Sequence, residues 1–110
     1  MAILNAAIQT TDTTILTVPA GKKYAITTLL VCNTGTDDGT GVNDSVFDMH
    51  VIPDGQVKSD TNLVLNNLGV SASDTFTFNV ERLILEENDR VVLVGQSPIN
   101  LSATISYLEV

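Results

Sequence analysis

Short segments rich in Val, Ile, Leu, Thr and Phe recur along the whole chain, separated by clusters of Gly, Pro, Asn, Asp and Ser. β-Branched and aromatic residues fit the pleated surface of a strand, and the clusters between them are typical of turns. About eight such segments occur at short spacing, and none has the period of a helix. A chain of 110 residues is long enough for one domain and hardly for two. We therefore expect residues 1–110 to form a single all-β domain, an antiparallel β-sandwich of the jelly-roll kind.

Two proline-containing turns separate expected strands. Pro19-Ala20-Gly21 and Pro53-Asp54-Gly55 each combine a proline, which presets φ for the first corner, with a glycine that tolerates positive φ. Strands are expected over residues 3–8, 13–18, 24–32, 46–52, 63–65, 75–85, 90–94 and 99–110. Residues 1–12 are expected to form either the first strand of the sandwich or an arm that adds a strand to a neighbouring subunit.

Alternation of apolar and polar side chains predicts which face of each strand lies in the core. Over residues 46–52, Phe47, Met49 and Val51 are expected to face the core, and Asp48 and His50 to face outward. Two further alternations are expected to form opposing walls of the core, namely Phe76, Phe78 and Val80 against Leu101, Ala103, Ile105 and Tyr107.

The strand over residues 24–32 has apolar residues on both faces near its end. Alternation places one set of side chains together, namely Tyr24, Ile26, Leu30 and Cys32, and the other set opposite, namely Ala25, Leu29 and Val31. We therefore expect a central strand that is covered on both faces.

The balance of 13 acidic and 5 basic residues gives a formal net charge of -8. Such a domain repels phosphate backbones and anionic membrane surfaces, so neither nucleic acid nor membrane is an expected partner. No apolar run approaches the roughly 18 residues of a membrane-spanning helix, and the N-terminus lacks the features of a signal peptide. Cys32 is the single cysteine and cannot form an internal disulfide, which favours a protein that matures in a reducing cytoplasm.

Few residues in the chain are suited to catalysis, and neither an enzyme nor a bound cofactor is expected. The single histidine, His50, has no second histidine or cysteine near it in the sequence, and Cys32 is expected to be a small buried side chain. Glu86, Glu87 and Asp89 share one turn, where neighbouring carboxylates diverge, so a glycosidase pair is not expected.

Residues 34–44 form the longest polar stretch and are expected to be an exposed loop. Asp37, Asp38 and Asp44 supply oxygen ligands of the kind that calcium prefers, although their spacing is not that of an EF-hand. Ordinary solvated loop chemistry and contact with a partner are the alternatives. The candidate interface residues elsewhere in the chain are Ile3, Leu4, Ile8, Asp48 and His50.

Two stretches carry a resemblance to a known group of proteins. These are TVPAGKKYAITTLLVCNTG, residues 17–35, and LILEENDRVVLVGQSPINLSATISYLEV, residues 83–110. Their order of turns and strands resembles that of small β-sandwich virion structural proteins of tailed bacteriophages, notably cyanophages. Where such proteins often carry Gly-Asp before the penultimate strand, this chain has Asn88 and Asp89.

The resemblance implies a role in assembly and supplies no catalytic residues. It implies a subunit of the virion, assembled in the host cytoplasm, that stabilises the capsid as a decoration or cement protein. Its expected partners are further copies of itself, as in a homotrimer, and a major capsid or tail protein. A component of the tail, neck, baseplate or fibre is the alternative within the same group.

A carbohydrate-binding or receptor-binding module is a further alternative from a different class, because sandwiches often serve as such modules. Sugar platforms need exposed aromatic side chains. The chain has no Trp and only two tyrosines, Tyr24 and Tyr107, and both are expected to face the core.

Overall fold

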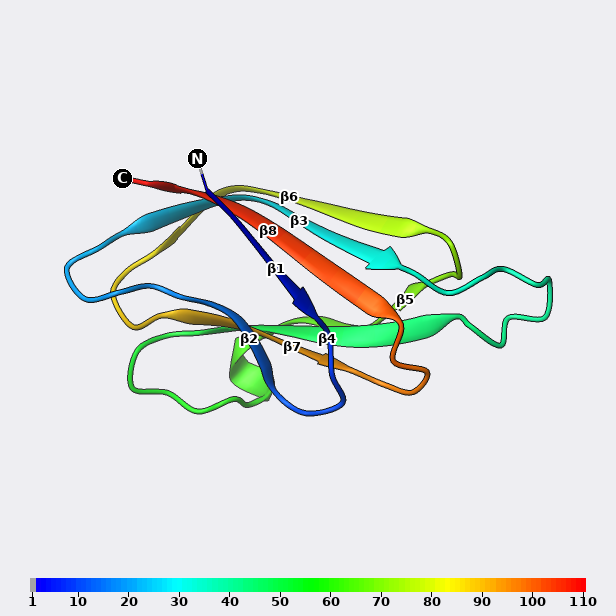
Figure 1. Cartoon of the computed structure of the whole chain (residues 1–110). Coiled ribbons are helices and arrows are strands. Elements are labelled where there is room, and N and C mark those ends of the chain that lie inside the picture. Colours follow the sequence, from blue (N-terminus) through cyan, green and yellow to red (C-terminus); the bar gives the residue numbers. More distant parts are fainter. Residues whose placement is uncertain (1) are drawn as a thin grey trace.

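Two four-stranded antiparallel sheets form the molecule, as the computed structural model in Figure 1 shows. The structure describes residues 2–110, with the exception of the side chains of residues 80–82. The strands are β1 (Ala2–Ala7), β2 (Thr13–Thr17), β3 (Tyr24–Asn33), β4 (Ser45–Ile52), β5 (Leu63–Val70), β6 (Thr75–Leu85), β7 (Arg90–Gly95) and β8 (Leu101–Glu109). A single turn of 3-10 helix, η1 (Asp60–Asn62), precedes β5.

The strand order identifies the sandwich as a jelly roll. β1 pairs with β8, β2 with β7, β3 with β6 and β4 with β5, all antiparallel. This is the pattern of one long hairpin that folds over into two layers, with the orders β1-β8-β3-β6 and β2-β7-β4-β5. The expectation of an all-β antiparallel sandwich of about eight strands is confirmed.

The N-terminal segment is the first strand of the sandwich. β1 pairs with β8 without any register shift, from Ala2 opposite Tyr107 to Ala7 opposite Ser102. Residues 2–7 therefore belong to the same domain as the other strands and do not extend from it as an arm. Met1 lies outside the described residues.

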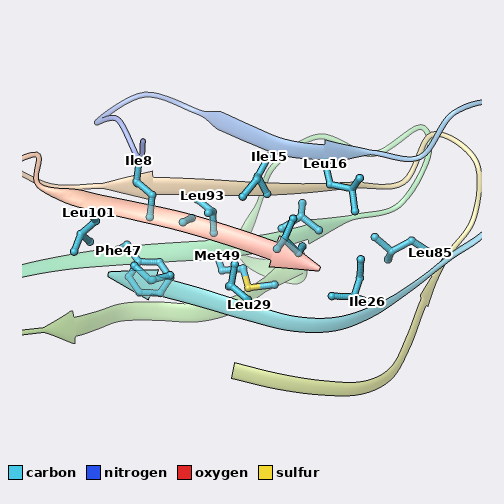
Figure 2. Close-up of a cluster of buried hydrophobic side chains, with 14 of the residues drawn as sticks. Ile8, Ile15, Leu16, Ile26, Leu29, Phe47, Met49, Leu85, Leu93 and Leu101 are labelled. Atoms are coloured by element: carbon cyan, nitrogen blue, oxygen red, sulfur yellow. The ribbon is translucent and has the colours of Figure 1, made fainter. Parts of the chain in front are cut away.

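Aliphatic side chains from both sheets fill the space between the layers (Figure 2). Phe47 and Met49 of β4 face the core with 1% and 0% exposure, as the alternation predicted, and Val51 packs against the same cluster. Phe76 and Phe78 are half-buried against it from the other sheet. Their strand β6 lies in the same sheet as β8, so the prediction that the apolar sides of these two strands form opposing walls of the core was wrong. The expected core position of Val80 falls among the side chains outside the described part of the structure.

A β-bulge in β3 overturns the expected arrangement of that strand. The register of β3 shifts between Ile26 and Thr28 against both of its neighbours, β6 and β8. An extra residue exchanges the two faces of a strand beyond it. Leu29 and Val31 consequently join Ile26 in the core, whereas Leu30 is 37% exposed. The prediction that both faces of this strand are covered was wrong.

Residues 53–62 lie over part of the outer face of the sheet β2-β7-β4-β5. We call this segment the cover. His50, Ile52 and Val92 are buried there without belonging to the central core cluster. His50 does face away from the central core, as predicted, but the prediction that it reaches the solvent was wrong. The loop that covers it returns from β4 to β5 and ends in η1.

Asn62 of η1 holds this cover in place. Its Oδ1 atom accepts a hydrogen bond from the backbone amide of Ser59 at 3.1 Å and lies 2.9 Å from Nδ1 of His50. Its Nδ2 atom donates to the carbonyl oxygen of Val57 at 2.9 Å.

No helix in residues 2–110 is both long enough and apolar enough to cross a membrane.

Replacing Asn62 with alanine is expected to destabilise the cover by about 2 kcal/mol, because three hydrogen bonds are lost at a buried position. Faster hydrogen exchange confined to residues 53–62 and β4 would reveal the change, since the central core is left intact. Val57→Ala is the control, because the Val57 side chain is 76% exposed and only its backbone carbonyl contacts Asn62. Equal exchange rates in both variants would contradict the role assigned to Asn62.

Candidate assembly surface

The outer face of the sheet β1-β8-β3-β6 is the candidate functional surface. Strand pairing fixes which residues lie side by side on it, because opposed residues in antiparallel strands share a face. The rows across the sheet are Ala7, Ser102, Cys32 and Thr75; Asn5, Thr104, Leu30 and Thr77; Ile3, Ser106, Thr28 and Asn79; and Leu108, Ala25 and Ile84. We call the surface formed by these side chains the neutral face.

None of the side chains in these rows carries a charge, although the chain has 13 acidic and 5 basic residues. Four of them are large exposed hydrophobic side chains: Ile3 at 63%, Ile84 at 52%, Leu108 at 43% and Leu30 at 37%. Isolated apolar residues are common on protein surfaces, whereas their grouping on one uncharged face is typical of an interaction site.

A shallow hollow of about 310 Å³ lies in the middle of the neutral face. Its lining residues come from β1, β3 and β8 and are Ile3, Thr28, Leu30, Thr104 and Ser106. The hydroxyl of Thr104 accepts a hydrogen bond from Nδ2 of Asn5 at 3.1 Å. Two apolar side chains beside three hydroxyl groups suit contact with an uncharged protein surface better than recognition of an ion.

The loop of residues 34–44 projects from the end of the sandwich (Figure 1). Its carboxylates bind the loop's own backbone: Asp37 Oδ1 accepts from the amide of Gly39 at 3.0 Å, and Asp38 Oδ1 from the amide of Thr40 at 2.9 Å. Asp44 Oδ1 accepts from the amide of Ala72 at 2.9 Å. These bonds stabilise the conformation of the loop.

The hydroxyl and the amide of Thr40 lower the pKa of Asp38 below its ordinary value of 3.8. A carboxylate with a depressed pKa stabilises the fold above its ordinary pKa, and that contribution is lost as the pH falls through the depressed value. The loop conformation around Asp38 is therefore expected to persist throughout the neutral and mildly acidic range.

Calcium binding by Asp37, Asp38 and Asp44 has no support in the geometry. Among the side chains of residues 2–79 and 83–110, no three of His, Cys, Asp or Glu are grouped so that they could hold a metal ion. A second open hollow, of about 400 Å³, does include Asp44, but its other lining residues are Ser45, Val46, Gly69, Val70, Ser71 and Ser97.

Chelation of divalent cations with EDTA is expected to leave the melting temperature unchanged, because the loop carboxylates already have protein donors. Differential scanning fluorimetry with EDTA and with millimolar calcium measures this. A rise in melting temperature with calcium that EDTA reverses would contradict this expectation.

The structure places the predicted interface residues in different environments. Ile3 is exposed on the neutral face, whereas Leu4 packs against the core and Ile8 is 1% exposed within it. Asp48 lies on the other sheet, where its Oδ1 atom accepts a hydrogen bond from the amide of Asn67 at 2.7 Å. His50 is buried beneath the cover. Ile8 and His50 therefore cannot contact a partner from the surface of this subunit.

Other residues of the neutral face were missed at the level of sequence. Leu30 and Cys32 were expected to be covered, and Ile84 and Leu108 were not singled out. Cys32 is half-buried on the neutral face, so the prediction of a buried core thiol was wrong. The signal available in the sequence was the polar alternation of Ser102, Thr104 and Ser106 in β8. Their partners in β3 could not be identified, because the bulge reverses which side chains of β3 lie on this face.

The two tyrosines do not form an exposed sugar platform. Tyr24 and Tyr107 contact each other with ring centroids 4.4 Å apart. Tyr24 is 8% exposed, and burial raises the pKa of its hydroxyl. Tyr107 packs against the core cluster, as the alternation predicted.

Comparison with known proteins adds no relative to this description. No protein family, curated sequence or solved structure matches the chain.

Proposed function

We propose that this protein is a non-enzymatic structural subunit of a bacteriophage virion, present in many copies and held by contacts between protein surfaces. The neutral face is the observation that carries this proposal. Although the chain is acidic, none of the side chains that form the neutral face is charged, and four of them are large exposed hydrophobic side chains.

The fold supports the same class of function. Jelly rolls recur in viral capsid proteins and in lectins, so the fold by itself leaves both classes open. The second class needs exposed aromatic side chains for sugar stacking, and Tyr24 and Tyr107 are packed on each other instead. The sequence resemblance to phage virion proteins favours the first class.

Within the virion, we assign the subunit to the capsid surface as a decoration or cement protein that binds the major capsid protein. The acidic loop of residues 34–44 and the turns would then give the assembled particle an acidic, soluble exterior. A place in the tail, neck, baseplate or fibre is the alternative.

Immunogold electron microscopy tests the proposal and its location together. Antibodies against the purified chain are applied to phage particles from a culture that carries the gene. Regular labelling of the capsid supports the decoration role, and labelling of the tail or fibres replaces it with the alternative. Purified particles that contain no trace of the chain by mass spectrometry would overturn the proposed function.

Leu30→Lys is expected to abolish binding to particles assembled without this protein, because it places a charge in the centre of the neutral face. The fold is expected to survive, since Leu30 is outside the core cluster. Co-sedimentation of the purified variant with such particles measures binding. The matched control is Val64→Lys on β5, where the replaced side chain is 46% exposed on the other sheet. Equal binding by both variants would exclude the neutral face as the contact surface.

A further inference from the structure

The four edge strands of the sandwich differ in how they are protected against pairing with another chain. β1 and β6 are the edges of one sheet, and β2 and β5 are those of the other. An unprotected edge offers free backbone amide and carbonyl groups to any further strand, and natural edges are blunted by charges, prolines, bulges or short length.

Three of these edges have such protection. β2 has only five residues, and its register shifts between Thr14 and Leu16. β5 has two register shifts against β4 and includes Asn67 at a positive φ of 50°. The sequence of β6 includes two charged residues, Glu81 and Arg82, and the pairing of β6 with β3 is shifted.

β1 has none of these features. Its sequence, AILNAA, contains no charge, proline or glycine, and its pairing with β8 is regular along its whole length. Ile3 on its outer side is 63% exposed. The first charged residue in the chain is Asp12, which lies outside the strand. The edge of β1 is therefore suited to pairing with an uncharged strand.

We propose that β1 pairs antiparallel with β1 of a second copy of this chain, so that the sheet continues across both copies. This pairing deepens the proposed function, because it names the contact through which copies of the subunit associate. It rests on the proposed function in one respect, namely that the subunit associates with further copies of itself.

Charge favours a second copy over other partners. Each copy carries a net charge of -8, so the repulsion between two copies is weakest where the contacting side chains are uncharged. A basic partner would instead be recognised by acidic side chains, and β1 has none. The uncharged edge of β1 therefore suits an uncharged partner strand, and β1 of a second copy related by two-fold symmetry is such a strand.

The strand geometry permits this pairing. A two-fold axis perpendicular to the sheet keeps Ile3, Asn5 and Ala7 of both copies on the outer face, and Leu4 and Ala6 of both on the core face. An axis through Leu4 places Ile3 opposite Asn5 of the second copy, and an axis through Asn5 places Asn5 opposite itself. In either register the neutral face becomes one continuous surface of two sheets.

The double variant Ile3→Lys/Asn5→Lys tests the pairing. It brings lysines of the two copies opposite each other in either register, and the dissociation constant of the dimer is expected to rise on the order of 100-fold. A six-residue strand spans only about 20 Å, so wild-type dimerisation is expected in the micromolar range. Analytical ultracentrifugation from about 1 µM to about 500 µM of the full chain covers that range.

The matched control is Thr75→Lys/Thr77→Lys on β6. These residues are exposed on the same neutral face at the opposite edge, and the change in net charge is identical. Circular dichroism and thermal unfolding check that each variant is folded, and the single variant Asn5→Lys replaces the double variant if the latter fails to fold.

A wild-type dimer that persists in the β6 variant and dissociates in the β1 variant supports the proposal. A wild-type monomer throughout the concentration range would overturn it, as would a dimer unaffected by the β1 variant. Dissociation of both variants would also overturn it and indicate packing through the neutral face itself. A homotrimer would exclude two-fold pairing while leaving the proposed virion function, which the labelling of particles tests separately.

Discussion

Replacing Phe47 with alanine is expected to reduce the free energy of unfolding by about 3–5 kcal/mol. Phe47 is 1% exposed and is the largest fully buried side chain of the core. Its ring lies 6.2 Å from that of Phe76, which comes from the opposite sheet. The substitution therefore removes a contact between the two layers and leaves a cavity that the rigid strands can close only in part.

Urea unfolding followed by circular dichroism measures the loss, which corresponds to a fall in melting temperature on the order of 15 °C for a domain of this size. Val64→Ala on the neighbouring strand β5 is the control, because that side chain is 46% exposed. A loss below about 1 kcal/mol for Phe47→Ala would mean that this ring does not join the two sheets.

Replacing Asn33 with alanine is expected to reduce the free energy of unfolding by about 3 kcal/mol, which is a large effect for a residue at the base of an exposed loop. The Asn33 side chain is 1% exposed at the end of β3. Its Nδ2 atom donates to the carbonyl oxygens of Asn43 at 2.8 Å and Val70 at 3.0 Å, and its Oδ1 atom accepts from the amide of Gly35 at 2.8 Å. Alanine would leave the carbonyl oxygen of Val70 and the amide of Gly35 without these partners, whereas the carbonyl oxygen of Asn43 would keep only its bond from Nδ2 of Asn100.

The loss is expected to disorder the loop of residues 34–44 as well as to destabilise the domain, because Asn33 joins both ends of that loop to β5. Chemical denaturation measures the stability, and hydrogen exchange of the loop amides measures the order. Asn66→Ala is the control, since Asn66 is exposed on β5. Unchanged exchange in the loop of the Asn33 variant would contradict the anchoring role.

Gly35 provides a separate reason for the compact base of this loop. A Cβ atom at Gly35 would lie 2.7 Å from Nδ2 of Asn100 and 3.0 Å from Oδ1 of Asn33. Nδ2 of Asn100 donates to the same carbonyl oxygen of Asn43 that Asn33 binds, at 2.9 Å. Asn33 and Asn43, near the two ends of the loop, and the distant Asn100 therefore surround one glycine, and no pattern within the loop indicates the contribution of Asn100.

Much of the strand content could be predicted because its signal is local. The alternation in residues 46–52 identified Phe47 and Met49 as core residues, and that in β8 identified Leu101, Ala103 and Ile105. The turn at residues 53–55 has the expected glycine, with Gly55 at a φ of 80°. β5 was expected over residues 63–65 but extends to Val70, because Leu68, Gly69 and Val70 pair with β4. Asn66 and Asn67 lie at the register shift of this pairing, where the amide of Asn67 donates to the side chain of Asp48.

The candidate surface was predictable only in part, since its side chains come from four strands. Ile3 was identified from the apolar N-terminal segment, but its neighbours on the neutral face are Ser106 in β8 and Thr28 in β3. Their adjacency depends on the pairing of the first strand with the last and of the last with the third, which no short-range pattern encodes.

The amino-acid sequence alone thus determined the all-β class, the short strands between turns and the acidic character, because propensity, alternation and charge act over a few residues. The tertiary structure decided the rest. Long-range pairing produced the bulge that turns Leu30 outward, the cover that buries His50, and the assembly of uncharged strand faces into one surface. Each of these depends on backbone hydrogen bonds or packing between segments far apart in the chain, where a shift of one residue reverses which side chains face the solvent.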